Sequence, residues 1–94
     1  MKPAVKYDNY TSTYNPDEIV TGTFKAGFGF IVGVTMHTFD ELCRKFNIAI
    51  LSREKLGGFI VKDYRIKIKG RHGDIRRLMC YLDDFWDKRT NLIN

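Results

Sequence analysis

A single change of hydrophobic period in the second half of the chain constrains the fold more than any other feature. Tyr64, Ile66 and Ile68 alternate with charged residues, which is the period of two of a half-buried β-strand. After Asp74 the apolar side chains recur every three or four residues, as on one face of a helix. They are Ile75, Leu78, Met79, Leu82, Phe85 and Trp86. The sequence therefore predicts a strand over residues 59–69 and then a helix that Asp74 caps.

Two runs of β-branched and aromatic residues precede this region, at residues 19–24 and 28–36. Lys25, Ala26 and Gly27 separate the two runs. A short connection that contains glycine between two such runs is typical of a β-hairpin. We therefore expect two antiparallel strands joined by a tight turn.

A short helix is predicted after this hairpin. Thr38 and Glu41 have the spacing of a capping box, in which each side chain bonds to the backbone amide of the other residue. Apolar residues follow at helical spacing, so we expect a helix over residues 38–47. Strand composition resumes at residues 48–51, and two glycines at 57–58 mark the turn before the basic strand.

The predicted elements follow the order strand, strand, helix, strand, strand, helix. This order favours an α+β fold with a four-stranded antiparallel sheet and two helices on one face. The 94 residues, 44% of them hydrophobic, suffice for a single domain with a modest core. Residues 1–17 show no sustained period, so we expect an irregular N-terminal arm and then a single α+β domain over residues 18–94.

Positive charge is concentrated in residues 62–77, which contain seven of the 16 Lys and Arg residues and only two acidic ones. The surplus in this segment equals the net charge of the whole protein, +5. Strand alternation places Arg65, Lys67 and Lys69 on the face opposite to the apolar residues. Such a row attracts polyanions, of which nucleic acid is the commonest. Lysines on an edge strand also prevent association between sheets, which is the alternative interpretation of the row.

The start of the last helix adds to this charge. Arg76 and Arg77 lie in its first turn, where the helix dipole disfavours cations, so helix stability does not explain them. Together with Arg71 in residues 70–73, which we expect to form a flexible loop because glycines flank it, they indicate an anion site at the junction of strand and helix. Asp74, as a cap, would occupy the same backbone amides. This competition favours a diffuse basic surface over a tight phosphate cradle.

A glycine-aromatic segment, residues 27–32, resembles the central part of the ribonucleoprotein octapeptide of RNA-recognition motifs. Residues 21–25 look like the first strand of cold-shock domains. The first resemblance implies that Phe28 and Phe30 stack on bases. The segment departs from the octapeptide at Ala26, where Lys or Arg is usual. The alternative is a hairpin whose phenylalanines point into the core and whose glycines leave the other face open to a flat ligand or a partner's backbone.

The sequence contains no complete catalytic, metal-binding or nucleotide-binding signature, so we expect a non-enzymatic protein without metal or cofactor. Cys43 and Cys80 have no second Cys or His at ligand spacing, and we expect free thiols. We interpret His72 as a solvent-exposed loop residue. The absence of an 18-residue apolar run and of a secretory signal favours a soluble cytoplasmic protein that binds no membrane.

These features favour a small module that binds nucleic acid, RNA ahead of DNA, through a basic strand and the following helix start. The residues predicted to contact phosphates are Arg65, Lys67, Lys69, Arg71, Arg76 and Arg77. Phe28 and Phe30 are the candidate stacking residues. The alternative is a small adaptor or inhibitor that binds an acidic surface of another protein, because the same charges would serve it equally well.

Overall fold

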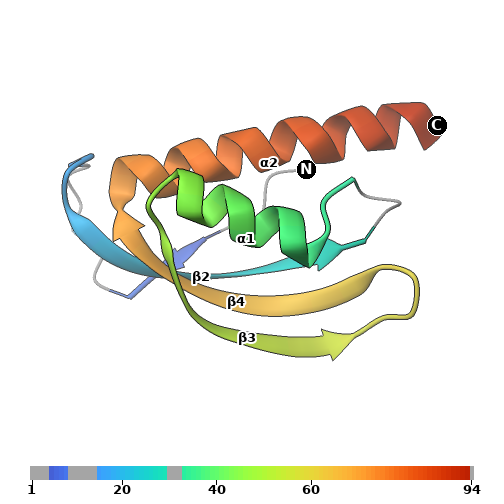
Figure 1. The fold of residues 1–94 in the computed structure, drawn as a ribbon, viewed down its shortest axis with the longest axis horizontal. Coiled ribbons are helices and arrows are strands. Elements are labelled where there is room, and N and C mark those ends of the chain that lie inside the picture. The colour runs from blue at the N-terminus through green and yellow to red at the C-terminus, as the bar shows by residue number, and fades with distance from the viewer. Residues whose placement is uncertain (1–4, 9–14, 30–32, 94) are drawn as a thin grey trace.

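The computed structural model describes residues 5–8, 15–29 and 33–93, with side chains up to residue 84 (Figure 1). The elements in chain order are β1 (Lys6–Tyr7), β2 (Ile19–Phe28), α1 (Met36–Lys45), β3 (Ala49–Gly57), β4 (Lys62–Arg71) and α2 (His72–Ile93). The strands form one antiparallel sheet in the order β1-β2-β4-β3, and both helices lie on the same face of it. The predicted α+β class, with four antiparallel strands and two helices on one face, is confirmed.

Strand β4 occupies the middle of the sheet because it pairs with β2 on one side and β3 on the other. Its pairing with β2 is continuous over all ten residues of both strands. The register puts Phe24 beside Ile66, and both side chains face the helices. Phe39 of α1 meets the Phe24 and Phe28 rings edge to face, with centroids 5.9 and 5.3 Å apart. The core therefore lies between one side of the sheet and the two helices.

The predicted apolar stripe on the last helix is confirmed over the side chains that the structure describes. The four buried members are Ile75, Leu78, Met79 and Leu82. The side chains of Phe85 and Trp86 lie outside the described residues. The helix is therefore fixed to the sheet by its first three turns, in which Arg76 and Arg77 are exposed and Asp74 is buried.

Helix α1 begins at Met36 and is capped by Thr35, not by Thr38 as predicted. The Thr35 hydroxyl oxygen accepts a hydrogen bond from the Thr38 amide at 3.2 Å, and the two hydroxyl oxygens are 3.0 Å apart. Thr38 is thus the third residue of the helix, and its amide is one that needs a partner outside the helix. The chain leaves α1 through Asn47, whose left-handed φ of 59° allows the last turn to close.

The predicted hairpin of residues 19–24 and 28–36 is wrong. β2 runs without interruption through residues 25–27 to Phe28, because β4 pairs with it along this whole length. Beyond β2, Gly29 and Val34 form a single bridge, with the Gly29 amide 2.8 Å from the Val34 carbonyl oxygen. The sheet gains its fourth strand from β1 instead.

The expectation of an irregular N-terminal arm is wrong at Lys6 and Tyr7, which form β1 along the edge of β2. Val5 and Tyr7 pack over Gly22, where the missing side chain leaves room for them. A Cβ at Gly22 would lie 2.6 Å from Val5 Cγ1. Residues 9–14 lie outside the described part of the chain, and the domain boundary at residue 17 stays a prediction.

The second pair of strands is shifted relative to the prediction. β3 extends well beyond the predicted 48–51, and β4 begins three residues after the predicted start at 59. The predicted glycine turn is confirmed, since residues 58–61 join the two strands. β3 is almost entirely exposed because this strand lies at the edge of the sheet, where its charged side chains remain in water.

Candidate functional site

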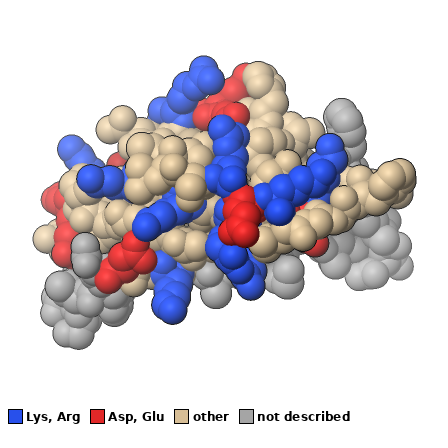
Figure 2. All heavy atoms as spheres, turned by 90° about the horizontal axis from the view of Figure 1, so that it is seen from below, with Lys and Arg blue, Asp and Glu red and all other residues tan. Residues whose placement is uncertain are grey.

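Four of the predicted phosphate contacts lie on the side of the sheet that faces away from both helices, which we call the open face. They are Arg65, Lys67, Lys69 and Arg71. These residues alternate along β4 with positions that are turned toward the core, at intervals of about 6.6 Å. The predicted alternation of this strand is confirmed. Figure 2 looks at the molecule from the side of the open face and shows Lys and Arg side chains spread across its middle.

The neighbouring strands widen this row. Lys25 lies opposite Arg65, and Thr23 lies opposite Lys67. On the other side of Thr23, β1 contributes Lys6. The three cations Lys6, Lys25 and Arg65 line a hollow of 390 Å³, and no acidic residue is among its described lining. The open face is therefore a cationic surface built by three strands.

Sequence reasoning missed Lys6 and Lys25. It placed Lys25 in a turn, although the even-numbered residues from 20 to 28 are all apolar or glycine. That period of two predicts one continuous strand with Lys25 on the polar side. No comparable signal exists for Lys6, because β1 contains only two residues.

Two acidic side chains form ion pairs with cations of the β4 row, and a bound polyanion would have to replace them. Glu54 of β3 binds Arg65, with Oε2 2.9 Å from Nη1, and Asp8 binds Lys67, with Oδ2 3.3 Å from Nζ. These side chains are 42–62% exposed, and ion pairs at such positions contribute about 0.2–1 kcal/mol. Among the described residues, no carboxylate lies within ion-pair distance of Lys69. A polyanion would therefore displace two weak pairs and meet one unpaired amine.

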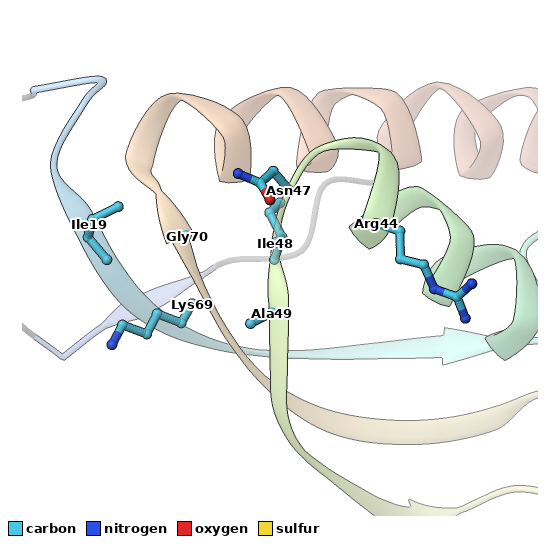
Figure 3. A pocket seen from close by; sticks show the side chains of 7 residues that line it. All are labelled: Ile19, Arg44, Asn47, Ile48, Ala49, Lys69 and Gly70. Carbon is cyan, nitrogen blue, oxygen red and sulfur yellow. The ribbon is translucent and has the colours of Figure 1, made fainter.

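Lys69 also lines a hollow of 410 Å³ at one end of the sheet (Figure 3). The apolar side chains of Ile19, Ile48 and Ala49 contribute to the same lining. The guanidinium group of Arg44, which also belongs to the lining, points away from these residues in Figure 3. Because Lys69 is the cation whose amine lies beside these apolar groups, we assign no separate anion site to this hollow.

The junction of β4 and α2 contains no loop, contrary to the prediction for residues 70–73. Arg71 ends the strand and His72 begins the helix. Gly70 is a buried strand residue that packs against Ile48, since a Cβ at Gly70 would lie 3.2 Å from Ile48 Cγ1. This glycine therefore serves close packing and not flexibility.

The first amides of α2 are occupied by the chain itself. The His72 amide donates to the Glu18 carbonyl oxygen at 2.8 Å, and the Gly73 amide donates to the Pro16 carbonyl oxygen at 3.0 Å. A phosphate at this helix start would need the same amides. The geometry thus disfavours a phosphate cradle at the junction, in line with the preference for a diffuse basic surface.

The two arginines of the first helical turns are separated from most of the row. Arg77 forms an ion pair with Asp74 and lines a hollow of 320 Å³ together with Arg71 and Asp17. Two cations and two carboxylates line this hollow, so their charges balance. Arg76 is exposed on α2 and is not among the lining residues. Only Arg71 belongs both to the open face and to the junction.

His72 is buried, with 5% of its surface exposed, and the expectation of a solvent-exposed loop histidine is wrong. Because β4 runs directly into α2, this position faces the interior. The imidazole ring meets the Tyr7 ring edge to face, with centroids 4.7 Å apart. His72 therefore connects β1 to the start of α2, and it is not available to an anion on the surface.

Phe28 is not available for stacking either. Its side chain is 2% exposed and packs on Phe39, so the alternative of a core phenylalanine is correct at this position. Phe30 lies outside the described residues. The bare glycine face of β2 is covered at Gly27 by the chain's own Val61, because a Cβ at Gly27 would lie 2.7 Å from Val61 Cγ1.

Neither Cys43 nor Cys80 forms a disulfide bond. Burial, together with the nearby Asp40 carboxylate, raises the pKa of the Cys43 thiol to about 12, so this thiol stays protonated at neutral pH. Among the described side chains, no group of three or more His, Cys, Asp or Glu could hold a metal ion. Neither helix has, in its described residues, an apolar stretch long enough to cross a membrane.

Comparison with protein-family models, with curated proteins and with solved structures finds no match to this chain. The function is therefore inferred from the molecule itself. The open face is the surface on which most of the predicted phosphate contacts come together.

Proposed function

We propose that this protein binds nucleic acid, RNA ahead of DNA, by holding the phosphate backbone on the open face. The observation that carries the proposal is the row of cations on β4, extended by Lys25 and Lys6, on a face that no described helix covers. The spacing of about 6.6 Å between successive cations allows a chain of phosphates to be contacted in sequence. Such contacts position a strand without reading its bases.

The chemistry of the row suits a polyanion of this kind. Two of its cations are held only by exposed carboxylates, from Glu54 and Asp8, that contribute little to stability. The hydroxyl groups of Thr21 and Thr23 lie on the same face and can donate to phosphate oxygens or bond to a ribose 2′-hydroxyl. We place RNA ahead of DNA because these hydroxyl groups can bond to the ribose 2′-hydroxyl, which DNA lacks.

The test reverses two charges on the open face. We expect the variant Lys67→Glu/Lys69→Glu to fold as the parent does, because both side chains point outward, and to lose binding to a fluorescently labelled single-stranded RNA. The matched control is Arg44→Glu/Lys45→Glu, which changes the net charge by the same −4 at two exposed positions on α1, the Arg44 guanidinium pointing away from Lys69 in Figure 3. Anisotropy titrations measure the affinities, and thermal melts confirm the fold.

Salt dependence gives a second measurement on the same proteins. The logarithm of the association constant should fall linearly with the logarithm of the salt concentration. Replacing Lys67 and Lys69 by Gln should reduce this slope by about 1.4 on single strands, since each phosphate contact contributes about 0.7. Equal losses in the open-face variant and the α1 control would mean that only net charge matters.

No binding of RNA or DNA by the parent protein would reject the proposal. An acidic surface on another protein would then be the better candidate partner. That adaptor function predicts one defined stoichiometry and capture of the partner from a lysate that has been treated with nuclease. The nuclease-treated capture therefore separates the two functions.

A further inference from the structure

The turn between β3 and β4 exposes a cluster of large apolar side chains, which we call the hairpin tip. Phe59 is 94% exposed, Ile60 is 62% exposed and Leu56 is 42% exposed. Figure 1 shows this turn at one end of the sheet, projecting beyond the strands that flank it. An almost fully exposed phenylalanine forgoes the stabilisation that burial would provide, which points to a role in contact with a partner.

The backbone of the hairpin tip is held in place by close packing on β2. Gly58 has a left-handed φ of 101°, and a Cβ there would lie 2.0 Å from the Val61 carbonyl oxygen. Val61 covers Gly27 with its side chain, and a Cβ at Gly29 would lie 2.8 Å from the Ile60 carbonyl oxygen. The turn is thus anchored by its backbone, and its Phe59 side chain is directed into solvent.

Two lysines flank the hairpin tip, which lies at the end of β4 where the row of cations begins. Lys55 and Lys62 stand on either side of the turn, and among the described residues neither has a carboxylate within ion-pair distance. Strand alternation places Lys62 on the helix side of β4 and Asp63 on the open face, and Arg65, the first cation of the row, lies two residues beyond Asp63. An apolar ring with cations on both sides is complementary to a base with its neighbouring phosphates.

The part of the open face that β2 and β4 form has no aromatic side chain among the described residues. Phe28, the aromatic residue that the sequence suggested, is buried. If a nucleic-acid strand lies along β4, the described aromatic residue that could stack on one of its bases is therefore Phe59 of the hairpin tip.

We propose that Phe59 stacks on an unpaired base of a single-stranded nucleic acid whose phosphates lie along β4. This inference rests on the proposed function and adds to it the position at which the protein contacts a base. Ile60 and Leu56 border the stacked base, and Lys55 and Lys62 contact the phosphates on either side of it. The protein then binds single strands in preference to duplexes, in which every base is already stacked.

The test compares two oligonucleotides of about 12 nucleotides, a length within the range of single-strand site sizes. One is a single-stranded RNA of mixed sequence, and the other is an abasic strand of the same length and charge. Phe59→Ala should weaken binding to the RNA by about 5- to 150-fold, the range for loss of one stacked base. Binding to the abasic strand should be unchanged, and Phe59→Tyr should retain most of the affinity for RNA.

Several results would overturn this inference. If Phe59→Ala weakens binding to both strands equally, or to neither, Phe59 contacts no base. If the variant loses binding only to vesicles of anionic lipid, the hairpin tip is a membrane contact. Failure of the proposed function itself would look different, because the parent protein would then bind neither oligonucleotide. Thermal melts of the variants should match the parent, since Phe59 is almost fully exposed.

Discussion

The ten residues of β4 point alternately to the two sides of the sheet, and the two sides differ in burial and in charge. On the side of the helices, Ile66 and Ile68 are completely buried and belong to a core cluster that contains residues of β2, α1 and α2. On the open face, Arg65 and Lys67 form ion pairs with the exposed carboxylates of Glu54 and Asp8. The first side carries the stability of the domain, whereas the second side contributes little to stability and is available to a partner.

This contrast separates what can be changed without loss of the fold from what cannot. A substitution toward the helices leaves a cavity in a packed interior. A substitution on the open face changes charge in water, where the effect on stability is small. The following three predictions test this division, in order of decreasing expected effect on the free energy of unfolding.

The largest effect is expected at Leu82 of α2, which is fully buried against the sheet. Leu82→Ala should lower the free energy of unfolding by about 2–5 kcal/mol, because it removes buried methyl groups and leaves a cavity. Urea denaturation followed by circular dichroism measures the change. Lys69→Ala on the open face is the control and should stay within about 0.5 kcal/mol of the parent. A loss at Leu82 as small as that of the control would contradict the core described above.

A smaller effect is expected at Gly22, where β1 packs on β2. Gly22→Ala places a Cβ 2.6 Å from Val5 Cγ1 and should destabilise the protein by about 1–3 kcal/mol through overpacking. Adding Val5→Ala removes most of the clash, so the double variant should be more stable than the sum of the two single changes predicts. Strict additivity in the same urea experiment would show that β1 is not docked at this position.

The smallest effect is expected at Glu54, the exposed partner of Arg65. Glu54→Gln should change the free energy of unfolding by about 0–1 kcal/mol. It should tighten RNA binding slightly, because Arg65 loses a competing anion. Glu41→Gln is a matched control, since Glu41 contacts His37 on α1 and is equally exposed. If both changes tighten binding alike, the pair with Arg65 is not a competitor of the RNA.

The elements that the sequence could predict are those with a long apolar period. The stripe of α2 and the alternation around Ile66 and Ile68 extend over many residues, and burial leaves only one way to orient them. Strand β1 could not be predicted in this way. Its position depends on the packing of Val5 and Tyr7 over Gly22, and this packing exists only in the folded sheet.

The predicted and observed elements differ mainly at glycine residues. The sequence pattern predicts a turn at Gly27 and a loop at Gly70, whereas both residues lie within strands and leave room for Val61 and Ile48. The sequence shows that a side chain is missing but not which neighbour fills the space. The buried position of His72 follows from the same error, because the expected loop would have placed it outside the core.

The candidate site was predictable only along one strand. The outward direction of Lys67 and Lys69 follows from the alternation of β4 alone. The contributions of Lys6 and Lys25, and the carboxylate that pairs with Arg65, depend on which strands are neighbours and in which register. Register between segments that are far apart in the sequence is set by the packed core, so it could not be inferred from local patterns.

The hydrogen bonds at the start of α2 link the breathing motions of two distant parts of the chain. The amides of His72 and Gly73 are held by carbonyl oxygens of Glu18 and Pro16, just before β2 begins. Fraying of the helix alone exposes these amides only if the segment before β2 also moves away. In hydrogen exchange, both amides would therefore follow the opening of a larger cooperative unit, one that joins the first long strand to the last helix.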